Sequence, residues 1–417
     1  MNVLHLNANT AGGAFTAANR LSAALSQVGV KSRHMVFSGN PGPGYQVWAD
    51  GFLKRMLALA GHAIEKLDFV RFEKNASVRF AFSHGLCGVD VTQWQAFIDA
   101  DIIHLHWINK GFISLQGLEQ IIRTGKPVVW TCHDMWPFTG GCYHNRGCNH
   151  FHTGCGDCQY LKKPATNDLS ARKFRQKQRL FDASNVHFVT PSAWLSLQAS
   201  ASPIAAQKPI AVIPNAIDTK VFKPGNSTEA MAGLGIPATS RVIAFAAANL
   251  SNPKKGFYEF IALLKRLKEA NVENIHILLI GENKDGSAFD LPFPHTFTGY
   301  ISDETAMVDC YQAASVYVTT SHEENLPTTI MESLACGTPV AAFAVGGIPE
   351  MVVDGETGWL SALFDVETLS NGILQYLSED DSKSLEMREK SRQAAVEYYD
   401  QLNVARRYAE LYKRVLK

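Results

Sequence analysis

Short apolar segments alternate with helix-like segments along almost the whole chain, and this alternation restricts the fold more than any other feature of the sequence. A helix predicted after the turn at Gly12-Gly13 runs to about Val28 and ends at Gly29, and further helices are expected over 40–95. Strands that alternate with helices pair in parallel and are joined by right-handed crossovers. In the first half, strands are predicted at VLHLN (3–7), DIIHLHW (101–107), PVVWTCHD (127–134), VHFVTPS (186–192) and IAVIPN (210–215).

The same pattern begins again after a turn-rich passage at 216–240. Since 417 residues exceed what one hydrophobic core usually supports, we expect two domains. The predicted fold class is α/β, with Rossmann-like doubly wound domains over 1–216 and 217–385, and with a C-terminal helix over 386–417. A ligand site is expected in the cleft between them, at the carboxyl ends of the strands. The second half combines a helix near 256–269 with strands at 241–248, 274–281, 297–301, 315–321 and 339–345.

Charge and cysteine content argue against several classes of protein. Lys+Arg and Asp+Glu each number 39, so no overall charge favours a nucleic-acid partner. The N-terminus lacks the basic and apolar regions of a signal peptide, and no segment is apolar enough to cross a bilayer. We therefore expect a cytoplasmic protein, which could work at the inner face of the membrane. In that reducing compartment the 8 cysteines are not expected to form disulfides.

The most informative segment is SHEENLPTTIMESLACGTPVAAFAVGGIPE (321–350), which follows a predicted strand. Pro327 suits the first helical position, and Gly337 suits the end of the same helix. The free N–H groups and the positive dipole end of that first turn predict a site for a phosphate or diphosphate. Glu332 can accept two hydrogen bonds from a ribose diol, and Glu324 can hold the hydroxyls of a sugar. The alternative is an ordinary strand–helix connection flanked by exposed glutamates.

Glu324 and Glu332 are spaced as in the Glu–seven-residues–Glu signature, and the segment resembles the family-four retaining glycosyltransferases of GT-B fold. The resemblance covers nearly the whole chain. It includes GGA (12–14), TCHD (131–134), VIPNAIDTKVFKP (212–224), NPKKGF (252–257), FTGYIS (297–302) and the closing helix, which resembles the one that crosses back to the first domain. It implies transfer of a hexose from a nucleotide-diphosphate sugar to a glycan or lipid-linked acceptor, in surface polysaccharide biosynthesis.

The resemblance also implies roles for single residues. Lys255 and the helix after Pro327 would stabilise the leaving diphosphate, so transfer would need no cofactor and no metal. The mechanism implied is front-face attack with retention at the anomeric carbon. The implied catalytic residues are His133, Lys255 and Glu324; the implied donor-binding residues are Gly13, Asn249, Lys255, Ile301, Glu324, Asn325, Leu326 and Glu332. His106, which ends a strand on the same face as His104, is a further site candidate.

Asn249 departs from the family pattern, which commonly has a basic residue six positions before the lysine matched by Lys255. An amide can donate hydrogen bonds but offers neither a charge nor a bidentate fork. We expect Lys254 to compensate. Two other readings stay open: a nonhydrolysing nucleotide-sugar epimerase, which shares the GT-B architecture, and a zinc module for nucleic acid or protein, against which the neutral charge speaks.

The segment GGCYHNRGCNHFHTGCGDCQYL (140–161) contains four cysteines within seventeen residues. A loop this poor in apolar residues has no hydrophobic core and needs a cross-link to hold its fold. Four thiolates can supply the four ligands of a tetrahedral zinc ion. The predicted ligands of a structural zinc ion are Cys142, Cys148, Cys155 and Cys158, with His144, His150 and His152 as alternative ligands. The competing interpretation is a set of buried, inert thiols.

Two cationic segments suggest contact with an anionic membrane surface. DLSARKFRQKQRLF (168–181) carries five cations within eight residues, although such a run is usually a solvated helix face. FLKRMLALAGHAIEKL (52–67) reads as an apolar helix that bears cations. The basic run could instead meet the diphosphate of an acceptor.

Overall fold

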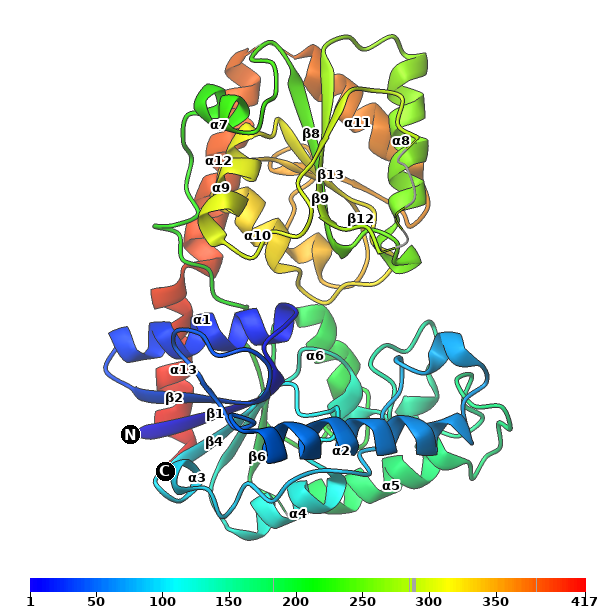
Figure 1. Ribbon diagram of the computed structural model, residues 1–417, viewed down its shortest axis with the longest axis vertical. Coiled ribbons are helices and arrows are strands. Elements are labelled where there is room, and N and C mark those ends of the chain that lie inside the picture. The colour runs from blue at the N-terminus through cyan, green and yellow to red at the C-terminus, as the bar shows by residue number, and fades with distance from the viewer. Residues whose placement is uncertain (183, 285, 287–289, 380) are drawn as a thin grey trace. The chain divides into compact units, whose positions relative to one another are not determined.

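The computed structural model describes residues 1–182, 184–284, 286, 290–379 and 381–417, and these form two compact units (Figure 1). Unit 1 comprises Met1–Ala216 and Leu402–Lys417, and unit 2 comprises Ile217–Gln401. The chain therefore leaves unit 1 after Ala216, builds the whole of unit 2, and returns to unit 1 for its last segment.

Unit 1 is built on a seven-stranded sheet in the order β3-β2-β1-β4-β5-β6-β7, and every neighbouring pair is parallel. This order places the first strand in the interior of the sheet, as in doubly wound folds. The strands are β1 (Asn2–Asn9), β2 (Lys31–Ser38), β3 (Gln46–Val47), β4 (Ile102–Leu105), β5 (Val128–Thr131), β6 (Val186–Thr190) and β7 (Ile210–Val212).

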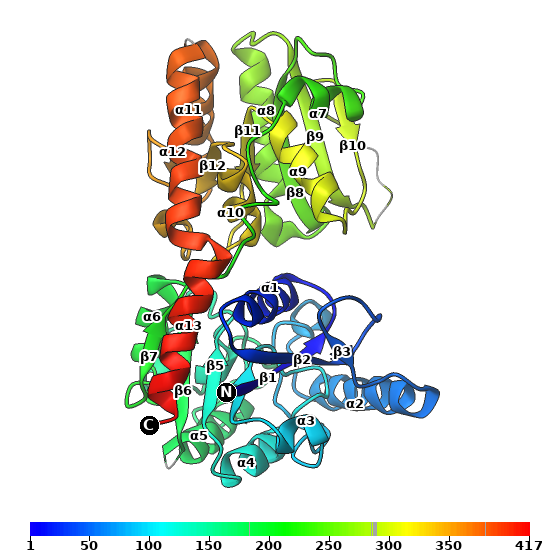
Figure 2. The same ribbon diagram turned by 90° about the vertical axis from the view of Figure 1, so that its left-hand side faces the viewer.

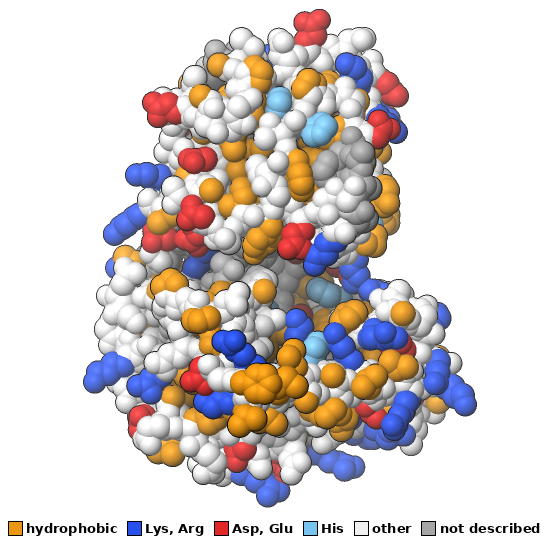
Figure 3. All heavy atoms as spheres, viewed as in Figure 1, with side chains coloured by type: hydrophobic (Ala, Val, Ile, Leu, Met, Phe, Trp, Pro, Cys, Tyr) orange, Lys and Arg blue, Asp and Glu red, His pale blue; other side chains and the backbone are white. Residues whose placement is uncertain are grey.

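Helices cover the sheet of unit 1, and the last of them comes from the end of the chain (Figure 2). They are α1 (Gly13–Gln27), α2 (Phe52–Val70), α3 (Gln95–Ile98), α4 (Leu115–Arg123), α5 (Leu169–Asp182), α6 (Ala193–Ser200) and α13 (Gln401–Val415). Hydrophobic side chains gather on the surface over α2, with Lys and Arg side chains around them (Figure 3).

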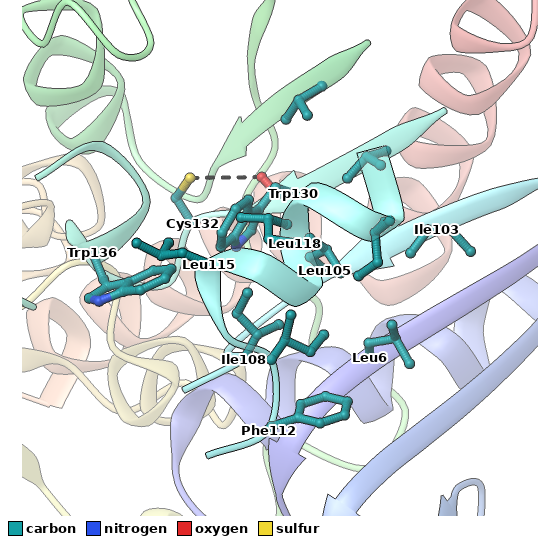
Figure 4. Packing of buried hydrophobic residues seen from close by; sticks show 14 of the residues in the cluster. Leu6, Ile103, Leu105, Ile108, Phe112, Leu115, Leu118, Trp130, Cys132 and Trp136 are labelled. Carbon is teal, nitrogen blue, oxygen red and sulfur yellow. Dashed lines mark hydrogen bonds between the residues drawn. The ribbon is translucent and has the colours of Figure 1, made fainter. Parts of the chain in front are cut away.

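The core of unit 1 lies on both faces of the sheet because successive side chains of a strand point to opposite sides. Leu6 of β1 and Trp130 of β5 pack with Leu115 and Leu118 of α4 on one face (Figure 4). Val3, the neighbour of Leu4 on β1, belongs to a second cluster on the other face, which α1 and α13 complete. Residues 402–417 are therefore part of the core of unit 1.

Unit 2 repeats the architecture with six parallel strands in the order β10-β9-β8-β11-β12-β13. Its strands are β8 (Arg241–Asn249), β9 (Ile275–Glu282), β10 (His295–Phe297), β11 (Val316–Thr319), β12 (Val340–Phe343) and β13 (Gly358–Ser361). Its helices are α7 (Ser227–Gly233), α8 (Phe257–Glu269), α9 (Glu304–Ala313), α10 (Thr328–Ala335), α11 (Val366–Ser378) and α12 (Asp381–Tyr399). The two Rossmann-like α/β units confirm the predicted fold class.

Two predicted elements differ from the structure. The strand expected at 297–301 lies instead at His295–Phe297, because Gly299 turns the chain with a φ of 71°. The C-terminal helix expected over 386–417 consists of two helices, α12 and α13, which meet at Asp400. Ile217 and Asp400 pair there as an isolated parallel bridge within unit 2.

In the part of the chain that the structure describes, no helix is both long enough and apolar enough to cross a bilayer.

Candidate functional site

Two lysines that follow β8 form ion pairs with two glutamates that follow β11. The Nζ atom of Lys254 lies 2.7 Å from Oε2 of Glu323, and that of Lys255 lies 2.5 Å from Oε1 of Glu324. β8 and β11 are neighbouring parallel strands, so the loops at their carboxyl ends meet at one edge of the sheet. The structure thus brings the predicted Lys255 and Glu324 together.

Two glycines hold the Glu324 loop closely against its neighbours. A β-carbon on Gly256 would overlap the carbonyl oxygen of Thr320, and one on Gly346 would overlap the carbonyl oxygen of Glu324. Both glycines have left-handed backbones, with φ of 72° and 58°, which other residues rarely adopt. The amide of Gly347 also donates to the carbonyl of Asn325 at 2.9 Å. The loop is therefore fixed from both sides by backbone contacts.

Glu332 lies on α10 but is buried, with 6% of its surface exposed. Its Oε2 accepts a hydrogen bond of 3.0 Å from the hydroxyl of Tyr311, which is itself fully buried on α9. Glu332 is therefore not a freely exposed carboxylate, because one of its oxygens already accepts a hydrogen bond inside unit 2. Its use in ribose binding would depend on the remaining acceptor capacity of the carboxylate.

Pro327 caps α10 instead of forming its first helical residue. Its ψ of 126° is extended, and the helix begins at Thr328. The amide of Ile330 donates to the carbonyl of Pro327 at 3.2 Å, which closes the first turn, and Gly337 follows the helix end with a φ of 73°. The predicted helix is thus present, displaced by one residue at its start.

Asn249 ends β8 and uses its side chain to shape the following turn. Its Oδ1 accepts a hydrogen bond of 3.1 Å from the amide of Ser251. Lys254, expected to compensate for the missing basic residue, is instead bound to Glu323. Compensation by Lys254 would therefore require this ion pair to open.

The other predicted donor-side residues lie in two loops of unit 2 and in unit 1. Asn325 and Leu326 are buried, with 9% and 6% of their surfaces exposed. Ile301 is half-buried against the apolar cluster around α9 and α10. Gly13 begins α1 of unit 1, and a β-carbon at this exposed position would meet no atom within 4 Å.

In unit 1, three histidines from neighbouring strands form a hydrogen-bonded chain. Nδ1 of His5 lies 3.0 Å from Nε2 of His106, and Nδ1 of His106 lies 3.0 Å from Nε2 of His133. His5 lies on β1, whereas His106 and His133 follow β4 and β5. His133 and His106 also line a small cavity of about 10 Å³ that Tyr408 of α13 borders.

The chain of imidazoles determines which nitrogen of His133 carries the proton. A neutral imidazole donates from one nitrogen and accepts at the other. Nε2 of His5 has no partner among the described residues, so it is better left as an acceptor, since a buried N–H without a partner is rare. His5 then donates to His106, and His106 donates to Nε2 of His133. Nδ1 of His133 therefore carries a hydrogen and acts as a donor.

Burial keeps these histidines neutral. It lowers the pKa of His133 to about 4, and it lowers the pKa of His5, His104 and His106 well below the ordinary value. His133 therefore remains an uncharged hydrogen-bonding group at neutral pH, which the sequence alone did not indicate.

His5, His104 and His106 are the one trio of possible ligand residues among those described whose ligand atoms lie within 4.8 Å of one another. Their hydrogen bonds argue against a metal there. Nδ1 of His104 lies 2.6 Å from the hydroxyl of Tyr412, and its Nε2 lies 2.8 Å from that of Thr131. Both nitrogens of His104 are thus used by hydroxyl groups.

Asp134 is a residue next to His133 that the sequence did not single out. Burial raises its pKa to about 7, although the indole N–H of Trp107 and the amide of Trp136 donate to it at 3.0 and 2.8 Å. A carboxyl with this pKa can hold or release a proton near neutral pH. Its position directly after the active-site histidine of the family pattern was the available signal.

The predicted zinc ligands share one cavity of about 20 Å³ in unit 1. It is lined by all four cysteines and by His150, among other residues. No three of the four sulfurs lie within 4.8 Å of one another, unlike the ligand atoms of the histidine trio. The nearby Lys177 belongs to the basic run at 168–181 but is buried, so the alternative of a solvated helix face does not hold for this residue. Burial lowers the pKa of Lys177 to about 7.

Comparison with known proteins decides the family. Residues 11–221, half of the chain, match the family model described as Glycosyltransferase Family 4. The chain belongs to glycosyltransferase family 4. Residues 226–397 of this glycosyltransferase also match the model described as Glycosyl transferases group 1.

The glycosyltransferase is similar to proteins of known name and structure. It is 26% identical over 301 residues to a D-inositol 3-phosphate glycosyltransferase of Corynebacterium diphtheriae, covering 68% of this chain and 64% of that protein. Its fold matches a sucrose-phosphate synthase of Thermosynechococcus elongatus with a TM-score of 0.69 and 18% identity, covering 100% and 99% of the two chains. It also matches Anabaena HepE, solved in complex with UDP, with a TM-score of 0.64 and 17% identity, covering 99% and 100%. The GT-B expectation is thereby confirmed.

Proposed function

We propose that this protein is a retaining, metal-independent glycosyltransferase that moves a hexose from a nucleoside diphosphate sugar to a glycan or a lipid-linked acceptor. The observation that carries the proposal is the ion pair of Lys255 and Glu324 at the carboxyl ends of β8 and β11, in the loop that leads into α10 and its Glu332. Membership of family 4 supports it, as does the UDP bound to a protein of the same fold. Synthesis of surface polysaccharide would be its setting.

Donor binding would rearrange the ion pair at this edge. A diphosphate beside Lys255 offers its ammonium a doubly charged partner in place of the single carboxylate of Glu324. Glu324 would then accept hydrogen bonds from hydroxyls of the donor sugar. Because the two glycine contacts fix the Glu324 loop, little reorganisation is needed to form these bonds.

Transfer with retention would proceed on one face of the sugar. The bond between the anomeric carbon and the diphosphate oxygen breaks, and the acceptor oxygen bonds to the same face of that carbon. The departing diphosphate oxygen takes the proton of the acceptor hydroxyl. Lys255 and the first turn of α10 stabilise the negative charge that develops on the diphosphate. The catalytic role of His133, which the family resemblance implies, stays a prediction.

The test is the turnover of Lys255→Ala at saturating donor, measured as nucleoside diphosphate released. We expect turnover to fall about 100-fold or more, as on removal of one charge-stabilising donor, and Lys255→Arg to keep more activity. Lys254→Ala is the matched control, because Lys254 forms the equivalent pair with Glu323, and we expect a much smaller loss. Wild-type turnover for Lys255→Ala would refute this placement of the diphosphate. Turnover should also survive brief chelation of magnesium and manganese.

The epimerase alternative is not favoured, since both matching family models describe glycosyltransferases. Product analysis without an acceptor distinguishes the two reactions. An epimerase would convert the nucleotide sugar itself, whereas the proposed transferase would leave its sugar unchanged.

We further propose that α2 docks on an anionic membrane. The helix buries only Ala58, Glu65 and Phe69, and Glu65 is held inside by the amides of Gly85 and Gly111 at 3.2 and 3.1 Å. Its exposed apolar side chains are those of Phe52, Leu53, Met56, Leu57, Leu59, Ile64, Leu67 and Val70. Lys54, Arg55 and Lys66 on the same helix suit anionic headgroups, which is the pattern of an interfacial helix (Figure 3).

Flotation with phosphatidylglycerol vesicles tests this docking. Leu53→Ser combined with Leu57→Ser should reduce the floated fraction, because both side chains are more than half exposed. Leu197→Ser on α6, where the side chain is 70% exposed, should leave it unchanged. Equal loss in both variants, or equal binding to uncharged phosphatidylcholine, would contradict the proposal.

A further inference from the structure

We propose that the segment 140–160 binds one zinc ion through the thiolates of Cys142, Cys148, Cys155 and Cys158, and that the buried ammonium of Lys177 balances the charge of this centre. The site is separate from the proposed donor site, since all five residues belong to unit 1. Its role is structural, because four cysteine ligands leave no coordination position open for a substrate.

The first support is the convergence of the four sulfurs on one cavity. Cys142 and Cys148 come from the first half of the segment and Cys155 and Cys158 from the second, yet all four line the same space of about 20 Å³. All four are free thiols in the structure. Tetrahedral coordination at about 2.3 Å would bring the sulfurs to roughly 3.8 Å from one another. Because no three sulfurs lie within 4.8 Å, metal binding would contract the cavity.

The second support is the set of hydrogen-bond donors directed at the sulfurs. The amide of Gly140 donates to Sγ of Cys155 at 3.3 Å. The amide of Tyr160 donates to the sulfur of Cys158, two residues earlier in the chain. Metal ligands are commonly held by such outer hydrogen bonds, which orient the ligand and stabilise its charge. These amides therefore suit thiolates better than inert thiols.

The third support is the backbone conformation of the segment, which is unfavourable unless a bound metal or another cross-link stabilises it. Arg146, Cys155 and Asp157 have left-handed φ values of 47°, 60° and 46° although none is glycine. Residues other than glycine rarely adopt this conformation, because it brings the β-carbon too close to the following carbonyl oxygen. The only regular structure described in 140–160 is the 3-10 helix His150–His152. Zinc ligation supplies folding free energy to loops of this kind.

The fourth support is Lys177, which is 1% exposed. Its Nζ donates to the carbonyl oxygens of Trp136 and Thr139, and it lies 3.5 Å from the centre of the Trp136 ring. These hydrogen-bond partners are neutral, and a buried ammonium is costly unless an opposite charge lies near it. Zinc with four thiolates carries a net charge of −2. Lys177 lies beside this cluster, because Thr139, whose carbonyl it binds, directly precedes Gly140, whose amide donates to Cys155. The facing carboxyl is that of Asp134, which also acts on Lys177.

His150 borders the cavity as the competing ligand. Its Nδ1 lies 2.8 Å from the carbonyl of Gly156, so Nδ1 carries the hydrogen and Nε2 holds a lone pair. The proposal assigns it no ligand role, because four cysteines already complete the tetrahedron. On binding, zinc displaces the four thiol protons to solvent, and four Zn–S bonds form.

The experiment measures metal content of the full chain purified without chelators. We expect close to one zinc per chain, released when a mercurial reagent blocks the thiols. The double variant Cys155→Ser and Cys158→Ser should lose the zinc, whereas Cys87→Ser, a half-buried cysteine of unit 1 outside the cluster, should keep it. His150→Ala should also keep it. Nucleotide binding by unit 2 serves as the folding control, and cobalt substitution should give the absorption of tetrahedral thiolate coordination.

Several results would overturn the proposal. Protein without zinc, protein holding iron in its place, or zinc retained by the double cysteine variant would each exclude the assigned centre. Loss of zinc from His150→Ala would exclude the ligand set. For the charge balance, Lys177→Met should weaken zinc binding about 10–100-fold in competition with a chelator, as changes in outer contacts do. Unchanged affinity would remove Lys177 from the site.

Discussion

Glu332 has a proposed role in ligand binding and an observed contact in the core of unit 2. Its carboxylate accepts the buried hydroxyl of Tyr311 while α10 carries it at the edge where the donor is expected to bind. Substitution with alanine therefore mixes two effects, because the buried Tyr311 hydroxyl loses its acceptor, which costs about 1–3 kcal/mol of folding stability.

Glu332→Gln separates these effects. The amide oxygen still accepts from Tyr311, so the free energy of unfolding should stay close to that of the wild type. Nucleotide affinity should fall, because the charged acceptor for ribose hydroxyls is lost, by about 1.5–3 kcal/mol. Denaturant unfolding and titration calorimetry with the best-bound nucleoside diphosphate of a panel measure both. Unchanged affinity in Glu332→Gln would exclude the ribose role.

The buried histidines of unit 1 predict a steep loss of stability in mild acid. Burial lowers the pKa of His34 to about 4, and it lowers the pKa of His5, His104 and His106 well below the ordinary value. Between the ordinary pKa of about 6.5 and the lowered value, the unfolded chain binds protons that the folded unit does not. The free energy of unfolding therefore falls as pH falls through this window, by about 1.4 kcal/mol per pH unit for each histidine.

Denaturant unfolding at a series of pH values between 7.5 and 5 measures this slope. All tryptophans except Trp359 lie in unit 1, so tryptophan fluorescence reports mainly on that unit. His34→Gln should reduce the slope by about one proton. A slope identical to that of the wild type would show that His34 is not the buried neutral group described here.

The sequence predicts the residues of the proposed donor site but not the contacts that these residues make in the fold. Glu324 and Glu332 lie on one continuous loop and helix, so their spacing alone predicts that they share a site. The partners Tyr311 and Lys255 come from other elements, and their contacts depend on how α9 and β8 pack, which no local pattern encodes. The same holds for the chain from His5 to His133, which needs the register of three strands.

At the scale of elements, the glycine contacts on the Glu324 loop can be tested by adding one methyl group. Gly346→Ala places a β-carbon against the carbonyl of Glu324, so the loop must shift. Gly355→Ala is the matched control, because Gly355 has a similar φ of 75° but open space around it. Both variants should lose about 1 kcal/mol from the left-handed backbone.

Only Gly346→Ala should impair function. We expect its turnover to fall roughly 100-fold, as for a misplacement of about 1 Å in a catalytic group. Nucleoside diphosphate release under saturating donor is the measurement. Equal turnover in the two variants would mean that the loop tolerates the added carbon and is not fixed as described.

Most strands were predictable because their apolar runs are buried on both faces. β2 (Lys31–Ser38) was missed, since its first three residues are polar and only part of it is buried. β2 is a strand because it pairs with β1, and the sequence of β2 does not show this pairing. The segment 297–301 was expected to be a strand because it contains apolar and aromatic residues. Gly299 interrupts it, however, and Phe297 remains 41% exposed. Tertiary position decided both cases.

At the scale of the whole molecule, α13 completes unit 1. Tyr412 is fully buried against Val3, Ile102 and other residues of the sheet, and its hydroxyl bonds His104. Tyr412→Ala should lower the free energy of unfolding of unit 1 by about 3–5 kcal/mol, the usual cost of removing a buried aromatic ring. Tryptophan fluorescence during urea unfolding measures the loss.

Tyr398→Ala is the control for this prediction. Tyr398 lies near the end of α12, and its side chain is 58% exposed. A change within about 0.5 kcal/mol is expected for such a surface site. Equal effects of the two substitutions would show that α13 contributes no more to unit 1 than an exposed helix end.

The return of the chain to unit 1 also sets an order for biosynthesis. Residues 402–417 leave the ribosome only after all of unit 2 has been made, so unit 1 spends that interval without Val404, Tyr408 and Tyr412 in its core. Domains usually fold from the N-terminus onward during translation. Here the synthesis of unit 2 is complete before that of unit 1, although unit 2 is translated second. The sheet face of unit 1 that α13 later covers would be the surface that a chaperone meets on the nascent chain.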